Sequence, residues 1–100
     1  MAQSLESIYT NIGRLIVKKI PKDWKTAQVI AEERDEGVFD WRGEYSLVNS
    51  EKPHKFVVGP QLMRLMMLVR QRIETPDKPA WRKATFTLKL DGQFDMVFDY

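Results

Sequence analysis

The chain of 100 residues carries 16 basic and 14 acidic side chains, with 43% hydrophobic residues and no cysteine. This composition is enough for one hydrophobic core, and it excludes intrinsic disorder, disulfide bonds, thiolate metal sites and a cysteine nucleophile. The near balance of charge does not indicate a nucleic-acid partner, and no stretch predicts a membrane span or a signal peptide.

Apolar residues near the start recur at steps of three and four, which places them on one face of a helix. Ser4 can cap this helix and Pro21 stops it, so we predict a helix over residues 4–20. Its apolar face comprises Leu5, Ile8, Tyr9, Ile12, Leu15, Ile16 and Ile20.

Two strands joined by an acidic turn are predicted next. Residues 24–34 carry Thr, Val and Ile in an extended pattern, and residues 38–42 combine β-branched and aromatic side chains directly after Gly37. Residues 32–37 (EERDEG) supply the turn between them. We expect Gly43 to end or bulge the second strand.

A third strand, at the edge of the sheet, is expected within residues 45–58. Apolar and polar residues alternate, as in a strand, only over residues 45–47 and 56–58, because residues 49–55 (NSEKPHK) have the composition of a loop. Pro60 then opens a second helix, since a proline in the first turn has no N–H to lose. The buried stripe of this helix comprises Leu62, Leu65, Met66, Val69 and Ile73.

The stretch TFTLKLDGQFDMVFDY (85–100) predicts a hairpin, because an Asp-Gly pair separates two runs of alternating apolar residues. A two-residue turn at Asp91-Gly92 would scatter the large side chains over both faces. A three-residue loop that begins at Leu90, with Gly92 left-handed, gathers them on one face, so we predict this register. The shared face, beneath both helices, then contains Phe86, Leu88, Phe94, Met96 and Phe98.

These elements follow one another in the order α-β-β-(β)-α-β-β. We therefore predict an α+β fold in which two helices pack on one face of an antiparallel sheet of four to five strands. One domain over residues 1–100, located in the cytoplasm, is expected.

Short motifs at both ends of the chain are similar to those of one protein family. Near the last residue the matching elements are Trp81, the strand TFTL (85–88), Asp91-Gly92, Gln93-Phe94 and the closing FDY (98–100). At the other end, YTNIGRLIVKKIPKDWK (9–25) is similar to the family's amphipathic first helix, which is followed by an Ile-Pro step and an acid-Trp pair. With their order preserved, the motifs at both ends of the chain resemble those of the YezG-like family of bacterial immunity proteins.

The resemblance implies an immunity protein, which is not an enzyme and needs no cofactor. Such a protein binds and neutralises a cognate toxin domain, for example a nuclease, by covering its active site or substrate groove. The residues agree with this expectation. His54 is the only histidine and has no partner at a metal-ligand or triad spacing, and residues 32–36 lack the spacing of a calcium loop. We expect no catalytic residue and no metal site, and the sequence indicates no oligomeric state.

Two surfaces are candidates for the partner-binding site. Acidic residues are concentrated in the turn after the first strand, where carboxylates suit the basic groove of a nuclease. The candidate acids are Glu33, Asp35, Glu36 and Asp40. The adjacent Trp41 is added to this first surface, because its ring can supply buried area. The alternative is the second helix, where Met63 and Met67 widen the apolar surface beyond the buried stripe.

A small nucleic-acid-binding module is the alternative function. Arg82 and Lys83 adjoin Trp81, and basic residues beside an aromatic ring can bind phosphate and stack on a base. The arginines of the second helix do not share one face, so the sequence favours a protein partner over nucleic acid.

Overall fold

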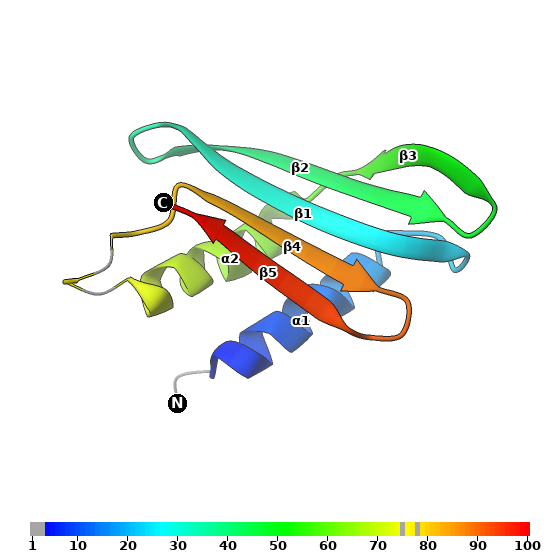
Figure 1. Cartoon of the computed structure of the whole chain (residues 1–100), viewed down its shortest axis with the longest axis horizontal. Coiled ribbons are helices and arrows are strands. Elements are labelled where there is room, and N and C mark those ends of the chain that lie inside the picture. The colour runs from blue at the N-terminus through cyan, green and yellow to red at the C-terminus, as the bar shows by residue number, and fades with distance from the viewer. Residues whose placement is uncertain (1–3, 75, 78) are drawn as a thin grey trace.

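The computed structural model describes residues 4–74, 76–77 and 79–100 (Figure 1). In this part of the chain, two helices lie on one face of a five-stranded antiparallel sheet, with the strands in the order β3-β2-β1-β4-β5. The elements are α1 (Leu5–Val17), β1 (Trp24–Asp35), β2 (Val38–Leu47), β3 (Ser50–Phe56), α2 (Gly59–Ile73), β4 (Lys83–Lys89) and β5 (Phe94–Asp99). The predicted α+β fold and its chain order are confirmed.

Helix α1 presents a stripe of isoleucines to the sheet. Ser4 caps the helix, since its Oγ accepts a hydrogen bond from the backbone N–H of Ser7 at 3.1 Å. The helix ends at Val17 rather than at residue 20, because the chain tightens into a turn in which the N–H of Lys19 donates to the carbonyl of Ile16 at 2.9 Å. The fully buried residues of the stripe are Ile8, Ile12 and Ile16.

Strands β1 and β2 form a long hairpin that turns at Glu36-Gly37, where Gly37 has a φ of 77°. The prediction that Gly43 ends or bulges the second strand is wrong, because β2 continues to Leu47. Gly43 is buried opposite Phe56 of β3, and a Cβ at this position would lie 2.7 Å from the Phe56 carbonyl oxygen. Glycine is needed here for close packing between strands rather than for a break.

Strand β3 forms one edge of the sheet and lies within residues 45–58, as predicted, but it runs through the stretch that was expected to interrupt it. Residues 49–55 were predicted as a loop, and that prediction is wrong, because Ser50–Phe56 pairs with β2. Tyr45 of β2 lies opposite His54 in this pairing. The strand tolerates Pro53 because an edge strand has one side without ladder hydrogen bonds.

The β4–β5 hairpin has the predicted three-residue loop. Leu88 lies opposite Phe94 and Phe86 opposite Met96, so the large side chains share the face beneath the helices. The N–H of Gly92 donates to the carbonyl of Lys89 at 2.9 Å, and Gly92 has a φ of 90°. The predicted register and the left-handed glycine are both confirmed.

Replacing Gly92 with valine is expected to lower the free energy of unfolding by about 1–2 kcal/mol, because a β-branched residue is strained at positive φ. No heavy atom lies within 4 Å of a Cβ built at this position, so the cost comes from the backbone alone. Urea unfolding measures the change. Gly92→Asn is the control, since asparagine tolerates the left-handed region. Equal midpoints for Gly92→Val and the wild type would contradict the strain argument.

The core lies between the helices and one face of the sheet. Two of the three tryptophans belong to this core, with Trp81 0% and Trp24 6% exposed. Ala27 and Val29 of β1 face the same core, and small residues there let the helices approach the sheet closely. Neither of the helices in the described residues has the length and apolarity that a membrane crossing requires.

Candidate functional site

The acidic residues singled out from the sequence lie at and around the tip of the β1–β2 hairpin. Asp35 and Glu36 are exposed at the tip itself. Arg34 links two of the acids, because its Nη1 lies 3.6 Å from Asp40 Oδ1 and its Nε lies 3.9 Å from Asp35 Oδ2. All three of these side chains are more than half exposed, so water and salt screen the ion pairs. The carboxylates at the tip are thus available to a partner.

Glu33 differs from these acids because its carboxylate is engaged inside the protein. Its side chain is 12% exposed. One oxygen, Oε2, lies 3.4 Å from Arg70 Nη2 of α2 and accepts a hydrogen bond from the N–H of Gly37 at 3.2 Å. The other, Oε1, lies 3.4 Å from Arg82 Nε. One carboxylate therefore joins the hairpin turn, α2 and the segment before β4, and it anchors the base of the hairpin.

Arg70 fixes this network against two aromatic rings. Its guanidinium carbon lies 5.0 Å from the ring centre of Phe39 and 5.7 Å from that of Trp81, and its Nε donates to the Trp81 carbonyl at 2.9 Å. Trp81 is fully buried, so its ring cannot stack on a base. Arg70 and Arg82 both pair with Glu33. Arg82 is 67% exposed, but without an exposed ring beside it the described cluster lacks the stacking platform of a nucleic-acid-binding module.

Trp41 and Asp40 point to opposite faces of the sheet, because side chains alternate along a strand. Trp41 lies opposite Ala31, which belongs to the core, so Trp41 is on the helix side. It is partly buried beside Phe39, with 6.2 Å between the ring centres. Asp40 lies on the other face with Arg34. The five residues singled out from the sequence therefore do not form one continuous surface.

Met63 and Met67 lie on the flank of α2 that faces β2. Residues three and four apart share one side of a helix, so both methionines lie in one row with Arg70. Arg70 lies over Phe39 of β2, which orients the whole row toward that strand. Trp41 lies beside Phe39 on the same face of β2, so it is on the side of the strand that α2 covers. We call Trp41, Met63 and Met67 the Trp-Met strip, and all three side chains are partly exposed.

An aromatic cluster that the sequence did not indicate continues this side of the sheet onto β3. Tyr45 stacks on His54, with ring centres 5.3 Å apart and planes at 21°, and it lies 6.4 Å from Phe56. All three residues are partly buried. His54 was expected in a surface loop and belongs instead to a strand. The alternation of His54 and Phe56 was the available signal, and the loop-like composition of residues 49–55 concealed it.

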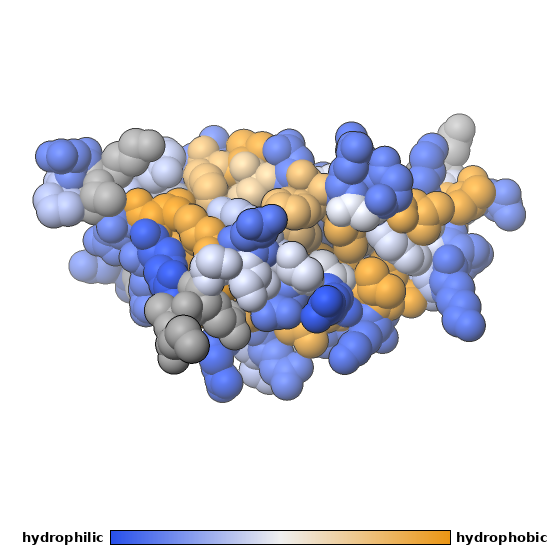
Figure 2. Space-filling model, turned by 90° about the horizontal axis from the view of Figure 1, so that it is seen from below, coloured by the Kyte–Doolittle hydropathy of each residue, from blue (hydrophilic) through white to orange (hydrophobic). Residues whose placement is uncertain are grey.

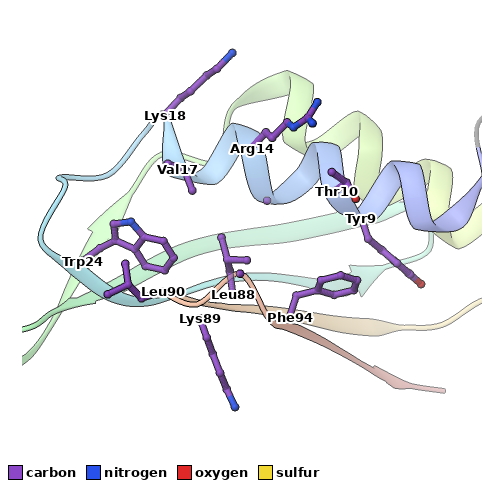
Figure 3. A pocket seen from close by; sticks show the side chains of 12 residues that line it. Tyr9, Thr10, Arg14, Val17, Lys18, Trp24, Leu88, Lys89, Leu90 and Phe94 are labelled. Atoms are coloured by element: carbon purple, nitrogen blue, oxygen red, sulfur yellow. The ribbon is translucent and has the colours of Figure 1, made fainter.

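A separate apolar groove of about 500 Å³ runs between α1 and the β4–β5 hairpin (Figure 3). Leu88 lies on its floor, and Trp24 and Phe94 lie toward opposite ends. The ring of Tyr9 is 5.4 Å from that of Phe94. Burial, with a smaller contribution from Tyr100, raises the pKa of Tyr9, so the phenol stays neutral at physiological pH. The groove was not predicted, because its residues come from three separate segments of the chain.

Comparison with known proteins finds a family that matches the chain. The family model described as "Immunity protein YezG-like" matches residues 5–100. This range includes both helices and all five strands of the described residues. No curated protein matches the chain.

Proposed function

The chain belongs to the YezG-like immunity protein family, and from this premise we propose that it binds a cognate toxin domain and neutralises it by covering the toxin's active site or substrate groove. The observation that carries the proposal is the family match over residues 5–100, from the start of α1 past the end of β5. In this role the protein is a cytoplasmic inhibitor without a catalytic step of its own. Its affinity then rests on the shape and charge of one surface.

The Trp-Met strip, extended by the acidic tip of the β1–β2 hairpin, is the surface that we assign to the toxin. Trp41 offers a large aromatic anchor, and Met63 and Met67 can adapt to an irregular partner. Asp35 and Glu36 lie at the end of the hairpin that carries Trp41. A toxin that acts on nucleic acid needs a basic groove, and a surface with an apolar centre and an acidic end complements such a groove.

Rescue of a toxin-producing cell tests the proposed function. A candidate toxin domain, chosen from the genes that neighbour the gene for this protein, is expressed in a bacterial host, with and without the protein. We expect the protein to restore growth and to elute with the toxin domain as one complex in size-exclusion chromatography. The proposal is wrong if the toxin stops growth equally in the presence of the folded protein and the two elute separately.

Reversal of charge at Asp35 and Glu36, both replaced by lysine, tests the acidic tip. Exposed charges act mainly on encounter, so we expect the association rate to fall by about tenfold at low salt while the dissociation rate changes little. Stopped-flow mixing at low and high salt measures both rates. The same reversal at Glu6 and Asp23, which are exposed and lie outside the β1–β2 hairpin, is the matched control. If the tip variant keeps the wild-type rate and salt dependence, the tip does not meet the toxin.

A further inference from the structure

The two edges of the sheet differ in their protection against an added strand. β3 carries Pro53 between Lys52 and Lys55, and proline and lysine discourage pairing at an edge. β5, at the other edge, carries neither residue type. Its helix-side residues are Phe94, Met96 and Phe98. Figure 2 shows a band of hydrophobic surface on the side where α1 and β5 lie in Figure 1. The composition of β5 thus favours pairing at this edge.

The backbone of β5 also directs hydrogen-bonding groups away from β4. In an antiparallel pair, residues that exchange hydrogen bonds with the neighbour alternate with residues whose N–H and C=O point away. The N–H of Lys89 donates to the carbonyl of Gln93 at 2.8 Å, and the register stays constant along both strands. Odd-numbered residues of β5 therefore bond to β4. The backbone N–H and C=O groups of Phe94, Met96 and Phe98 therefore point away from β4, to the edge where the described sheet has no further strand.

We propose that two copies of this chain pair antiparallel through β5, with Met96 of one copy opposite Met96 of the other. This register satisfies the outward backbone groups of all three even-numbered residues. On the outer face it places Asp95 opposite Val97 of the second copy. The two adjacent registers that keep the same faces would place Asp95 opposite Asp95 or Asp99, and like charges directly opposite destabilise a strand pair. The pairing does not depend on toxin binding.

The same register covers exposed apolar side chains on the helix side. Phe94, which is 42% exposed, lies opposite Phe98 of the second copy and gains an aromatic neighbour. Tyr100 follows β5 and is 57% exposed. In this register it lies opposite Gly92 of the second copy, which lines the groove between α1 and the hairpin. Each copy therefore contributes to closing the open side of the other.

Sedimentation equilibrium over a concentration series tests the pairing. We expect the wild type to dimerise and Met96→Pro to raise the dissociation constant on the order of a hundredfold, because proline removes the central outward N–H and obstructs the bonds beside it. The hydrogen bonds between β4 and β5 do not use the N–H of Met96, so we expect the variant to fold. Circular dichroism checks that its secondary structure is kept. Met96→Val is the matched control, and it should dimerise like the wild type.

Charge at position 97 tests the register while the backbone stays unchanged. Val97→Lys places a lysine opposite Asp95 at two symmetric positions and should tighten the dimer by about tenfold, whereas Val97→Asp should weaken it by about tenfold. The proposal is overturned by a wild type that is monomeric at every concentration, by a dimer that Met96→Pro leaves intact, or by a dimer that Val97→Lys weakens. If a monomeric chain loses toxin binding with Met96→Pro, the edge pairs with a toxin strand and self-pairing is wrong.

Discussion

Replacing Trp81 with alanine is expected to lower the free energy of unfolding by about 3–5 kcal/mol, the range for truncation of a large buried aromatic side chain. The ring is fully buried, meets Phe39 edge-on at 5.7 Å between ring centres and stacks on Phe98 at 6.1 Å. It also supports one side of the Arg70 guanidinium. Small domains are stable by about 5–15 kcal/mol, so this loss is a large part of the total. Urea unfolding followed by circular dichroism measures it.

Trp81→Phe is the matched control, because it keeps an aromatic ring against both neighbours and leaves a smaller cavity. We expect it to unfold between the wild type and Trp81→Ala. An alanine variant with the wild-type midpoint would show that the ring is not part of the core. The nucleic-acid-binding alternative is tested by Arg82→Glu combined with Lys83→Glu. It would be favoured if the wild type bound single-stranded DNA and this variant, still folded, lost that affinity.

Replacing Trp41 with alanine is expected to weaken the toxin complex by at least about 2 kcal/mol, which is the scale of an interface hot spot. Trp41 is partly exposed on the helix side of β2, beside Phe39, where Arg70 holds the strand against α2. Met67→Glu should have an effect of similar size, because it places a charge in the apolar part of the Trp-Met strip. Isothermal titration calorimetry with the cognate toxin domain measures both affinities.

Arg42→Ala is the control for these variants, because Arg42 is exposed on the same strand but on the opposite face. We expect this substitution to leave the toxin affinity unchanged. An interface on the outer face would reverse the result, so that Arg42→Ala and Asp40→Ala weaken the complex while Trp41→Ala and Met67→Glu do not. Thermal unfolding of each variant separates a lost contact from a lost fold.

Local patterns were enough to predict the helices and the β4–β5 hairpin. The three-residue loop followed from requiring Phe86, Leu88, Phe94 and Met96 to share one face, and a one-residue slip would have turned half of them to solvent. An edge strand was predicted within residues 45–58, but residues 50–56 were assigned to a loop, because an edge strand carries proline and lysine, the same residues that mark a loop. Composition cannot separate these two cases.

The candidate site was less predictable than the fold, because it depends on contacts between distant segments. From sequence, Glu33 belonged with the other acids of the turn, and nothing local indicated that Arg70 and Arg82 would meet its carboxylate. Alternation along β2 would have separated Trp41 from Asp40 once the helix-side face of that strand was known. Placing Trp41 and the methionine row on the same side of the sheet required the packing of α2 on β2.

The two strands that pair with the central strand β1 are synthesised at very different times. β2 follows at once, whereas β4 comes much later in the chain, and Gln28 of β1 bonds to Thr87 of β4 across a separation of 59 residues. Closing so long a loop is slow, because its entropy must be lost before the contacts form. A nascent chain that has not reached Arg82 also lacks one of the two arginines that hold Glu33. On the proposed function, this sets a delay between translation and protection, so we expect only finished copies to protect a cell against the toxin.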